Sequence, residues 1–446
     1  MLHCGARFLH RRVLILWSPQ VTTQKSSYSK TVPETTSKKP QSSSNSLNLD
    51  DGKVFRLKTK WELSRGLLVF FLCSSPWLVQ KAPKFVAGET HKEIKETLQR
   101  LQHLGVRPLL AVPIEEDVGE EKEGEGWYDK NAQSMITCLD LSVGSAPNPM
   151  MQLKVTALMA AELCKTITLC LQNKEGISDL SIERVIAALS GHEVSFNCLS
   201  QEENQHFQKS LRRLNSVAQY AVEKGVRVLV DAEYTYINPA LTLVTIAMMA
   251  TWNTQKPWIW NTYQAYLKDT LERLKHDVAL AEHLGVCFGV KLVRGAYLNK
   301  ERKLAKEKGY PDPVQPSWEA TNENYRSCLE FGLDQVSQVK ERFEMIVATH
   351  NEASVTHAVQ RMSQMGIAKN AGPICFGQLL GMCDQVSLAL GQAGFAIYKS
   401  IPYGSVEEVI PYLIRRAHEN QSVLLGIRKE RDLLRLELWR RILRRP

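Results

Sequence analysis

The sequence lacks the residue spacings by which metal and dinucleotide sites are usually recognised. Its ten cysteines include no Cys-x-x-Cys pair, so reduced and mostly buried thiols are expected. His350 and His357 stand seven residues apart, but no acidic or cysteine partner completes a metal site around them. No Gly-x-Gly-x-x-Gly follows an expected strand, and no Walker-type loop occurs. These absences argue against a metal-dependent hydrolase and against a dinucleotide held on a Rossmann half.

Long hydrophobic runs are also missing. The apolar stretch at residues 66–79 is interrupted by Ser74, Ser75 and Pro76 and is shorter than the roughly 20 residues that a membrane span needs. A buried or membrane-surface helix is expected there. Residues 427–445 hold eight basic and three acidic residues among leucines and a tryptophan. This basic amphipathic tail suits either an anionic membrane surface or a helix packed on the body with a solvated basic face.

Acidic residues are absent before Glu34. Residues 1–60 contain eleven lysines and arginines but three acids, which accounts for +8 of the formal net charge of +9. Because the rest of the chain is nearly neutral, nucleic-acid binding is not expected. The early basic residues Arg7, Arg11 and Arg12 stand among apolar ones. This composition is typical of a mitochondrial transit peptide.

Beyond residue 100, the sequence alternates between short apolar runs and longer segments of helical periodicity. The eight apolar runs lie at residues 106–113, 151–158, 226–233, 258–264, 287–297, 345–350, 374–380 and 395–401. The helical segments include residues 203–224, 265–283, 319–342, 352–365 and 385–393. Alternating strands and helices imply a parallel sheet, and eight such units predict an α/β fold of the (β/α)₈ barrel type.

Charged and hydrogen-bonding residues stand where several of these runs end. Asp231 and Glu233 end the third run, Arg294 comes late in the fifth, and His350 and Asn351 end the sixth. Any one of them alone could be a cap or a structural ion pair. Barrel enzymes keep their chemistry at the carboxyl ends of the strands, so the recurrence predicts a catalytic mouth.

Two adjacent arginines follow the last apolar run. At 100° per residue, Arg415 and Arg416 share a helical stripe with Tyr412 and Glu419, away from an apolar stripe at positions 406, 410, 413 and 417. The planar fork of arginine suits bidentate binding of a carboxylate. The same spacing also fits an ordinary solvated helix with basic residues in its last turns.

Five of these segments together resemble the proline dehydrogenase family. They are QLKV at residues 152–155, VDAE at 230–233, KLVRGAY at 291–297, ATHN at 348–351 and YLIRR at 412–416. The similarity covers roughly residues 86–425, in the same order as in the family. It implies a distorted barrel that binds FAD at its strand ends, hydride transfer from the substrate ring to flavin N5, and a membrane quinone as electron acceptor.

The resemblance also implies roles for individual residues. The substrate carboxylate is expected against Lys154, Arg415 and Arg416, with Asp231 orienting Lys154 through a charge-assisted hydrogen bond. The substrate ring is expected between Tyr297, Leu379 and Tyr412. The positions matching the flavin site are Asp231, Gln264, Lys291, Arg294, Gly295, Ala296, His350, Asn351 and Glu419.

Ser400 is the expected determinant of the substrate. It stands fifteen residues before Arg415, where proline-oxidising members of the family carry a tyrosine against the ring. The smaller serine leaves room for a 4-hydroxyl and can bond it. The sequence therefore predicts oxidation of 4-hydroxyproline to 1-pyrroline-3-hydroxy-5-carboxylate, with weaker activity on proline. A structurally neutral serine, a proline-preferring enzyme and a non-catalytic membrane-associated barrel are the alternatives.

These predictions divide the chain into four parts. Residues 1–50 form a transit peptide and disordered linker, 51–100 an N-terminal helical segment, 101–425 the flavin-binding barrel and 426–446 the basic C-terminal helix. We expect a mitochondrial protein, in the matrix or on the matrix face of the inner membrane. One departure from the family is a short connection, residues 80–84, before the motif that begins at Phe85.

Overall fold

The computed structural model describes residues 47–73, 91–114, 119, 124–370, 372–402 and 424–443. Eight parallel strands close into a barrel in chain order. They are β1 Arg107–Ala111, β2 Met150–Leu153, β3 Arg227–Val230, β4 Ile259–Gln264, β5 Phe288–Val293, β6 Phe343–Ala348, β7 Ile374–Leu379 and β8 Ile397–Pro402. Each predicted apolar run overlaps one strand, and the predicted α/β barrel is confirmed.

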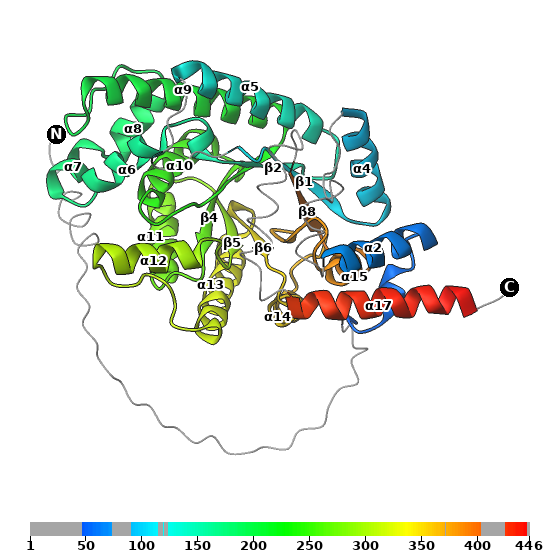
Figure 1. The fold of residues 1–446 in the computed structure, drawn as a ribbon. Helices are drawn as coiled ribbons and strands as arrows, with labels where there is room; N and C mark the ends of the chain where they lie inside the picture. Colours follow the sequence, from blue (N-terminus) through cyan, green and yellow to red (C-terminus); the bar gives the residue numbers. More distant parts are fainter. Residues whose placement is uncertain are drawn as a thin grey trace, which may run out of the picture.

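Helices surround the barrel and connect its strands (Figure 1). Along the barrel they are α5 Gly124–Ser142, α6 Ala161–Cys170, α7 Lys174–Asp179, α8 Ile182–Leu189, α9 Gln201–Lys224, α10 Asn238–Trp252, α11 Thr270–His283, α12 Leu298–Lys308, α13 Trp318–Val339, α14 Glu352–Gln364 and α15 Asp384–Gln392, with short 3₁₀ turns η2 Val155–Ala157 and η3 Lys340–Arg342. Outside it lie η1 Gly52–Phe55, α2 Lys60–Cys73, α4 His91–His103 and α17 Leu424–Leu443. Within the described residues, no helix is both long and apolar enough to cross a membrane.

Helix α9 shows how local sequence sets these boundaries. The Ser200 hydroxyl accepts from the Glu203 backbone N–H at 3.1 Å, and the Glu203 carboxylate accepts from the Ser200 N–H at 2.8 Å. This capping box satisfies two donors that the first turn leaves open. The helix ends at Gly225, whose φ of 68° is left-handed and therefore favours glycine. The chain then enters β3 directly.

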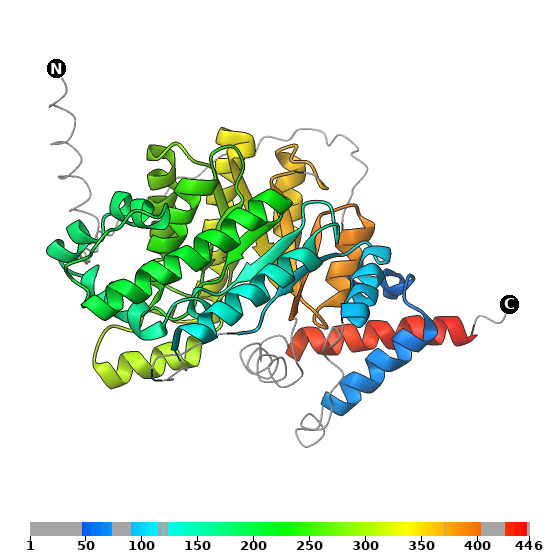
Figure 2. The same cartoon turned by 90° about the horizontal axis from the view of Figure 1, so that it is seen from above.

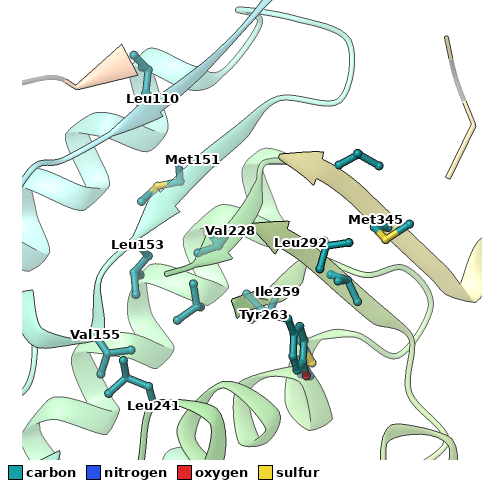
Figure 3. Packing of buried hydrophobic residues seen from close by; sticks show 14 of the residues in the cluster. Leu110, Met151, Leu153, Val155, Val228, Leu241, Ile259, Tyr263, Leu292 and Met345 are labelled. Atoms are coloured by element: carbon teal, nitrogen blue, oxygen red, sulfur yellow. The ribbon is translucent and has the colours of Figure 1, made fainter. Parts of the chain in front are cut away.

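Successive side chains along each strand point alternately outward and inward, and this alternation produces two apolar layers. Outward-facing residues such as Leu110, Met151 and Leu292 pack under the helices (Figure 3). Inward-facing residues fill the barrel itself: Leu109, Met150, Leu229, Trp260, Ile346, Cys375, Ala396 and Tyr398. A filled barrel has no pore. Inward-facing polar side chains therefore gather at one end of the strands, above this apolar layer.

Helix α17 packs against α2, η1 and α15, and Figure 2 shows α2 and α17 side by side at one edge of the molecule. Leu433 and Leu434 are buried in this contact. Glu437 is fully buried and binds both Arg440 and Arg441 at 2.7 Å. Part of the basic charge predicted for this tail is therefore neutralised by the helix itself.

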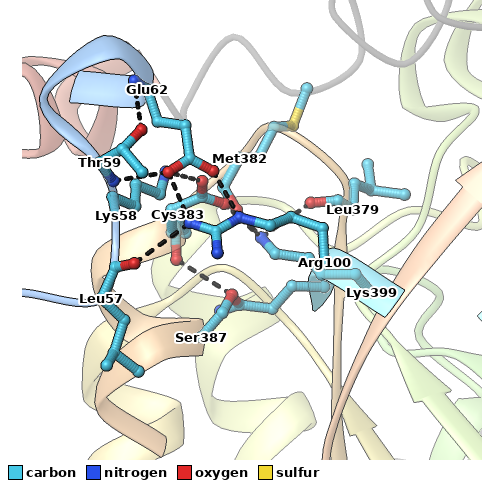
Figure 4. Close-up of polar contacts among 12 residues, drawn as sticks. Leu57, Lys58, Thr59, Glu62, Arg100, Leu379, Met382, Cys383, Ser387 and Lys399 are labelled. Carbon is cyan, nitrogen blue, oxygen red and sulfur yellow. Dashed lines mark hydrogen bonds and ion pairs between the residues drawn. The ribbon is translucent and has the colours of Figure 1, made fainter. Parts of the chain in front are cut away.

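A cluster of ion pairs joins this N-terminal region to the barrel (Figure 4). Lys58, just before α2, donates to Asp384 at 2.6 Å, and Asp384 also pairs with the buried Lys399 of β8 at 3.1 Å. Lys399 in addition donates to the backbone carbonyl of Leu379 at 3.0 Å and to that of Met382. The two lysines thereby hold the pKa of Asp384 well below its usual range, even though burial opposes this. The cluster fixes the turn after β7.

Candidate active site

A cavity of about 470 Å³ opens at the carboxyl ends of the strands. Every described residue with a predicted role lines it: Lys154, Asp231, Gln264, Lys291, Arg294, Gly295, Ala296, Tyr297, His350, Asn351, Leu379 and Ser400. The cause is topological, because the carboxyl ends of all eight parallel strands meet at one end of the barrel. Residues more than 240 positions apart therefore share one cavity.

Asp231 is the acidic centre of the cavity. Its Oδ1 accepts a hydrogen bond from Lys291 Nζ at 2.6 Å, while its Oδ2 lies 3.7 Å from Lys154 Nζ. The charge-assisted hydrogen bond therefore goes to Lys291, and Lys154 approaches at ion-pair distance. All three side chains are at most 16% exposed. They place two positive charges and one negative charge in a site from which water is largely excluded.

Arg294 is a partly buried cation held by neutral groups. Its Nε donates to Thr349 Oγ1 at 3.0 Å and its Nη2 to Ser354 Oγ at 2.8 Å, while Nη1 binds the Asn322 side chain. The ring of Tyr325 lies 4.8 Å from the guanidinium carbon. Burial lowers the pKa of Arg294 from its ordinary value. Since its partners within the described chain carry no charge, the guanidinium is suited to an anionic ligand.

His350 offers an unused polar atom to the same cavity. Its Nδ1 is buried and has no hydrogen-bond partner within the described residues. Burial, reinforced by the charges of Lys399 and Arg294, lowers the pKa of His350 to about 3. The imidazole is therefore neutral at physiological pH and can donate or accept one hydrogen bond to a ligand at Nδ1.

This depressed pKa predicts that acid weakens the fold through His350. The unfolded pKa is 6.5 and the folded value is about 3, so the contribution is complete above pH 6.5 and is lost as the pH falls towards 3. Acidification from pH 7 to pH 5 should cost about 2 kcal/mol of unfolding free energy through this residue. In urea denaturation at both pH values, His350→Asn should lose less stability on acidification than wild type. His192→Asn, at an exposed histidine, is the control; equal pH sensitivity in wild type and His350→Asn would contradict the prediction.

Gly295 lets the backbone itself form part of the wall. Its φ is +136°, and a Cβ built there would lie 1.8 Å from Cδ1 of Tyr266. No other residue fits this position without displacing the ring. The glycine therefore makes room for the Tyr266 ring, while Gly295 and Ala296 both line the cavity.

Two of the predicted residues also support the cavity walls. Gln264 donates to the Glu233 carbonyl at 3.1 Å and accepts from Asn238 at 3.0 Å. The Asn351 side chain caps α14 by accepting from the Ser354 N–H at 2.9 Å. These contacts fix the side chains before any ligand arrives.

The remaining predicted residues form an apolar and hydroxylic part of the lining. The Tyr297 ring packs against Tyr234, with centroids 4.2 Å apart. Leu379 lies at the end of β7. Ser400 is 5% exposed, and its hydroxyl donates to Gln152 Oε1 at 3.0 Å. This part of the cavity is suited to a small ring that carries a polar group.

Comparison with known proteins identifies the family. The model for proline dehydrogenase matches residues 94–429. The chain belongs to the proline dehydrogenase family. It is thus an oxidoreductase. Among curated proteins, it is 54% identical to hydroxyproline dehydrogenase of Xenopus laevis (89% of this chain and 90% of that protein) and 50% identical to the Homo sapiens protein of that name (88% and 93%).

Solved structures of the proline dehydrogenase fold agree with the barrel. The crystal structure of proline utilization A from Bdellovibrio bacteriovorus superimposes with a TM-score of 0.61 at 20% identity. It covers 83% of this chain, which in turn spans 36% of that longer protein. At this identity the match supports the fold alone.

Four predicted site residues, Tyr412, Arg415, Arg416 and Glu419, lie outside the described residues. The same holds for the short connection at residues 80–84. The cavity also has lining residues that were not predicted, among them Gln152, Trp318, Gln378 and Lys429. Gln152 could have been found, because it stands two positions before Lys154 on the same strand face. Lys429 could not, because it belongs to α17 and reaches the site only through tertiary packing.

Cysteines and metal ligands add no second site. The eight cysteines whose side chains the structure describes are free, and six of them are buried. Among the described residues, no group of three or more His, Cys, Asp or Glu side chains is arranged so that it could hold a metal ion.

Proposed function

We propose that this chain oxidises 4-hydroxyproline at the ring carbon next to nitrogen, using FAD, and forms 1-pyrroline-3-hydroxy-5-carboxylate. The choice of substrate depends on one observation. Ser400, a small side chain with a hydroxyl group, lines the cavity and donates a hydrogen bond to Gln152. Relatives named hydroxyproline dehydrogenase, 50–54% identical over most of their length, support the same substrate. The membership of the family supports the same reaction class.

The charged and hydrogen-bonding groups that line the cavity fit FAD. Among the described residues, Arg294 supplies a partly buried positive charge with neutral partners, His350 a buried ring nitrogen without a partner, and Gly295 and Ala296 a stretch of backbone in the cavity lining. Arg294, Gly295 and Ala296 would hold the pyrophosphate and ribityl part, and Gln264 and Lys291 would face the flavin ring. Asn351 and Glu419, which follows β8 in the sequence, would bind parts of FAD farther from the flavin ring. When bound, FAD supplies the hydride acceptor for the reaction.

The substrate would be held by charge at one end and by packing at the other. Lys154 provides a buried ammonium for the carboxylate, and Arg415 and Arg416, which follow β8 in the sequence, would join it. Tyr297, Leu379 and Tyr412 would enclose the ring. Several cations near the ring nitrogen also disfavour its ammonium form, and the neutral amine is the form that can give up hydride.

Ser400→Tyr is expected to exchange the substrate preference. The added ring fills the space for a 4-hydroxyl, so kcat/KM for 4-hydroxyproline should fall by on the order of 100-fold, while that for proline holds or rises. Steady-state kinetics with both amino acids measures the ratio. Ser216→Tyr, on the exposed face of α9, is the control for the substitution itself. Ser387→Tyr would not serve, because Ser387 is buried. An unchanged ratio in Ser400→Tyr contradicts the proposed specificity.

We further propose a mitochondrial enzyme that docks on a membrane and passes its electrons to a quinone. Proline dehydrogenases of several animals are named mitochondrial. Six of the ten exposed large hydrophobic residues in the described chain lie on α2 and α17: Trp61, Leu68, Leu436, Trp439, Ile442 and Leu443. Exposed Arg428 and Arg435 flank them. Aromatic and aliphatic side chains beside cations suit an anionic bilayer surface. Lys429 of the same helix lines the cavity, so the site would open close to the membrane.

This docking surface predicts vesicle binding. Wild-type protein should sediment with vesicles containing anionic lipid and less with neutral ones, because both burial of apolar side chains and charge contribute. Trp439→Ser combined with Leu443→Ser should reduce binding at least about tenfold, since each removes an exposed apolar anchor. Val143→Ser combined with Leu169→Ser removes exposed apolar side chains elsewhere and is the matched control. Equal binding by the two double variants contradicts the surface.

A further inference from the structure

We propose that Gln152 is a specificity-determining residue, which recognises the ring hydroxyl of the substrate jointly with Ser400. The two side chains come from β2 and β8, are 7% and 5% exposed, and are joined by the hydrogen bond from Ser400 Oγ to Gln152 Oε1 at 3.0 Å. Both line the cavity. The inference rests on the proposed oxidation of 4-hydroxyproline and adds a second residue to its specificity.

The barrel itself places the two side chains together. Met150 of β2 and Tyr398 of β8 both face the barrel interior. Side chains two residues further along each strand point the same way, which brings Gln152 and Ser400 one layer closer to the cavity mouth. Strand β1 lies between them, with Leu109 paired to Met150 on one side and to Ser400 on the other. The regular register of the strands, rather than the conformation of a loop, therefore sets the distance between the two side chains.

Lys154 stands two residues beyond Gln152 and also lines the cavity. Two strand residues span roughly 7 Å. This is comparable to the reach of a five-membered ring from its carboxylate to a hydroxyl on its far side, with a hydrogen bond at each end. One strand therefore carries both the carboxylate anchor and the proposed hydroxyl contact.

The hydrogen-bond chemistry of the pair matches a hydroxyl. Because the Ser400 proton is given to Gln152 Oε1, the lone pairs of Ser400 Oγ are available to accept from a ligand. The Gln152 amide nitrogen brings N–H donors of its own. A substrate hydroxyl both donates and accepts, so it can donate to Ser400 Oγ and accept from Gln152 Nε2. Proline presents a CH₂ group instead, which can bond neither the remaining lone pairs of Ser400 Oγ nor the N–H donors of Gln152, and this loss is costly.

The test is the ratio of kcat/KM for 4-hydroxyproline to that for proline. Gln152→Leu keeps a similar shape without polar atoms. It should lower kcat/KM for 4-hydroxyproline by about 10- to 100-fold and change that for proline by less than about threefold. Gln378→Leu is the matched control, because Gln378 lines the same cavity but its amide serves Thr349 and Ser387. The control should leave the ratio unchanged even if it lowers both rates. A Gln152→Leu ratio equal to that of wild type overturns the proposal.

Binding of substrate analogues gives a readout that does not depend on turnover. Proline and 4-hydroxyproline analogues with oxygen in place of the ring nitrogen cannot be oxidised in the same way, so their inhibition constants report binding. Wild type should favour the hydroxylated analogue, and Gln152→Leu should lose that preference. Retention of the preference by Gln152→Leu overturns the role of Gln152.

Combining Gln152→Leu with Ser400→Ala tests whether the two residues act as one unit. If they do, the double variant loses no more selectivity than the more affected single variant. Independent, multiplicative losses overturn joint recognition. A wild-type enzyme that prefers proline would refute the proposed function, and this inference with it. A hydroxyproline-selective wild type with an unaltered Gln152→Leu ratio refutes the inference alone.

Discussion

Lys154→Met is expected to lower kcat/KM for 4-hydroxyproline by on the order of 100- to 1000-fold, because it removes a buried positive charge that meets the substrate carboxylate. The Lys154 side chain is 5% exposed, so water cannot readily replace the lost interaction. The flavin should be retained, since the cations on the proposed flavin side, Lys291 and Arg294, are untouched. Steady-state kinetics together with the flavin-to-protein ratio measures both effects.

Lys429→Met is the matched control for this prediction. Lys429 also lines the cavity, but two carboxylates, Asp50 and Glu352, bind it at 2.6 Å. Its loss should change kcat/KM by less than about fivefold, as for a partly exposed ion pair. If Lys154→Met and Lys429→Met had the same small effect, Lys154 would not anchor the substrate.

Asp231→Ala is expected to destabilise the protein by about 3–5 kcal/mol, the usual cost of removing one partner of a buried ion pair. Asp231 serves two buried ammonium groups, at 2.6 Å and 3.7 Å. Asp231→Asn keeps a hydrogen-bond acceptor for Lys291 and should cost less. Chemical denaturation followed by circular dichroism measures both variants.

Asp269→Ala provides the comparison for Asp231→Ala. Asp269 pairs with Arg273 at 2.6 Å on the surface, where both side chains are about half exposed. Removing such a pair should change the unfolding free energy by about 0–1 kcal/mol. Similar losses in the Asp231 and Asp269 variants would show that the centre of the cavity contributes no more than a surface pair.

The strands and the cavity lining were accessible from the sequence for a simple reason. Strands in a parallel barrel are buried on both faces and read as short apolar runs, and their carboxyl ends converge wherever they stand in the chain. Residues as distant as Lys154 and Ser400 could thus be assigned to one cavity before their positions were known. Ser400 could be singled out because a family pattern specifies a larger residue there.

Other features depend on contacts that no local pattern encodes. Lys399 looked like one more strand residue, yet it is fully buried and pairs with Asp384, which also binds Lys58 more than 320 positions away. Asp231 was expected to bind Lys154, but its short hydrogen bond goes to Lys291 from a different strand. For Asp231 the choice is between distances of 2.6 Å and 3.7 Å to two lysines, and spacing along the chain does not resolve such a difference.

The visible spectrum of the purified protein tests the central claim most directly. A flavin absorption band should be present and, without oxygen, should bleach on addition of 4-hydroxyproline but hardly change with an equal concentration of proline. This result would establish the cofactor, the reaction and the substrate preference together. Protein that folds and binds 4-hydroxyproline but carries no flavin, or whose flavin proline reduces as readily as 4-hydroxyproline, would contradict it.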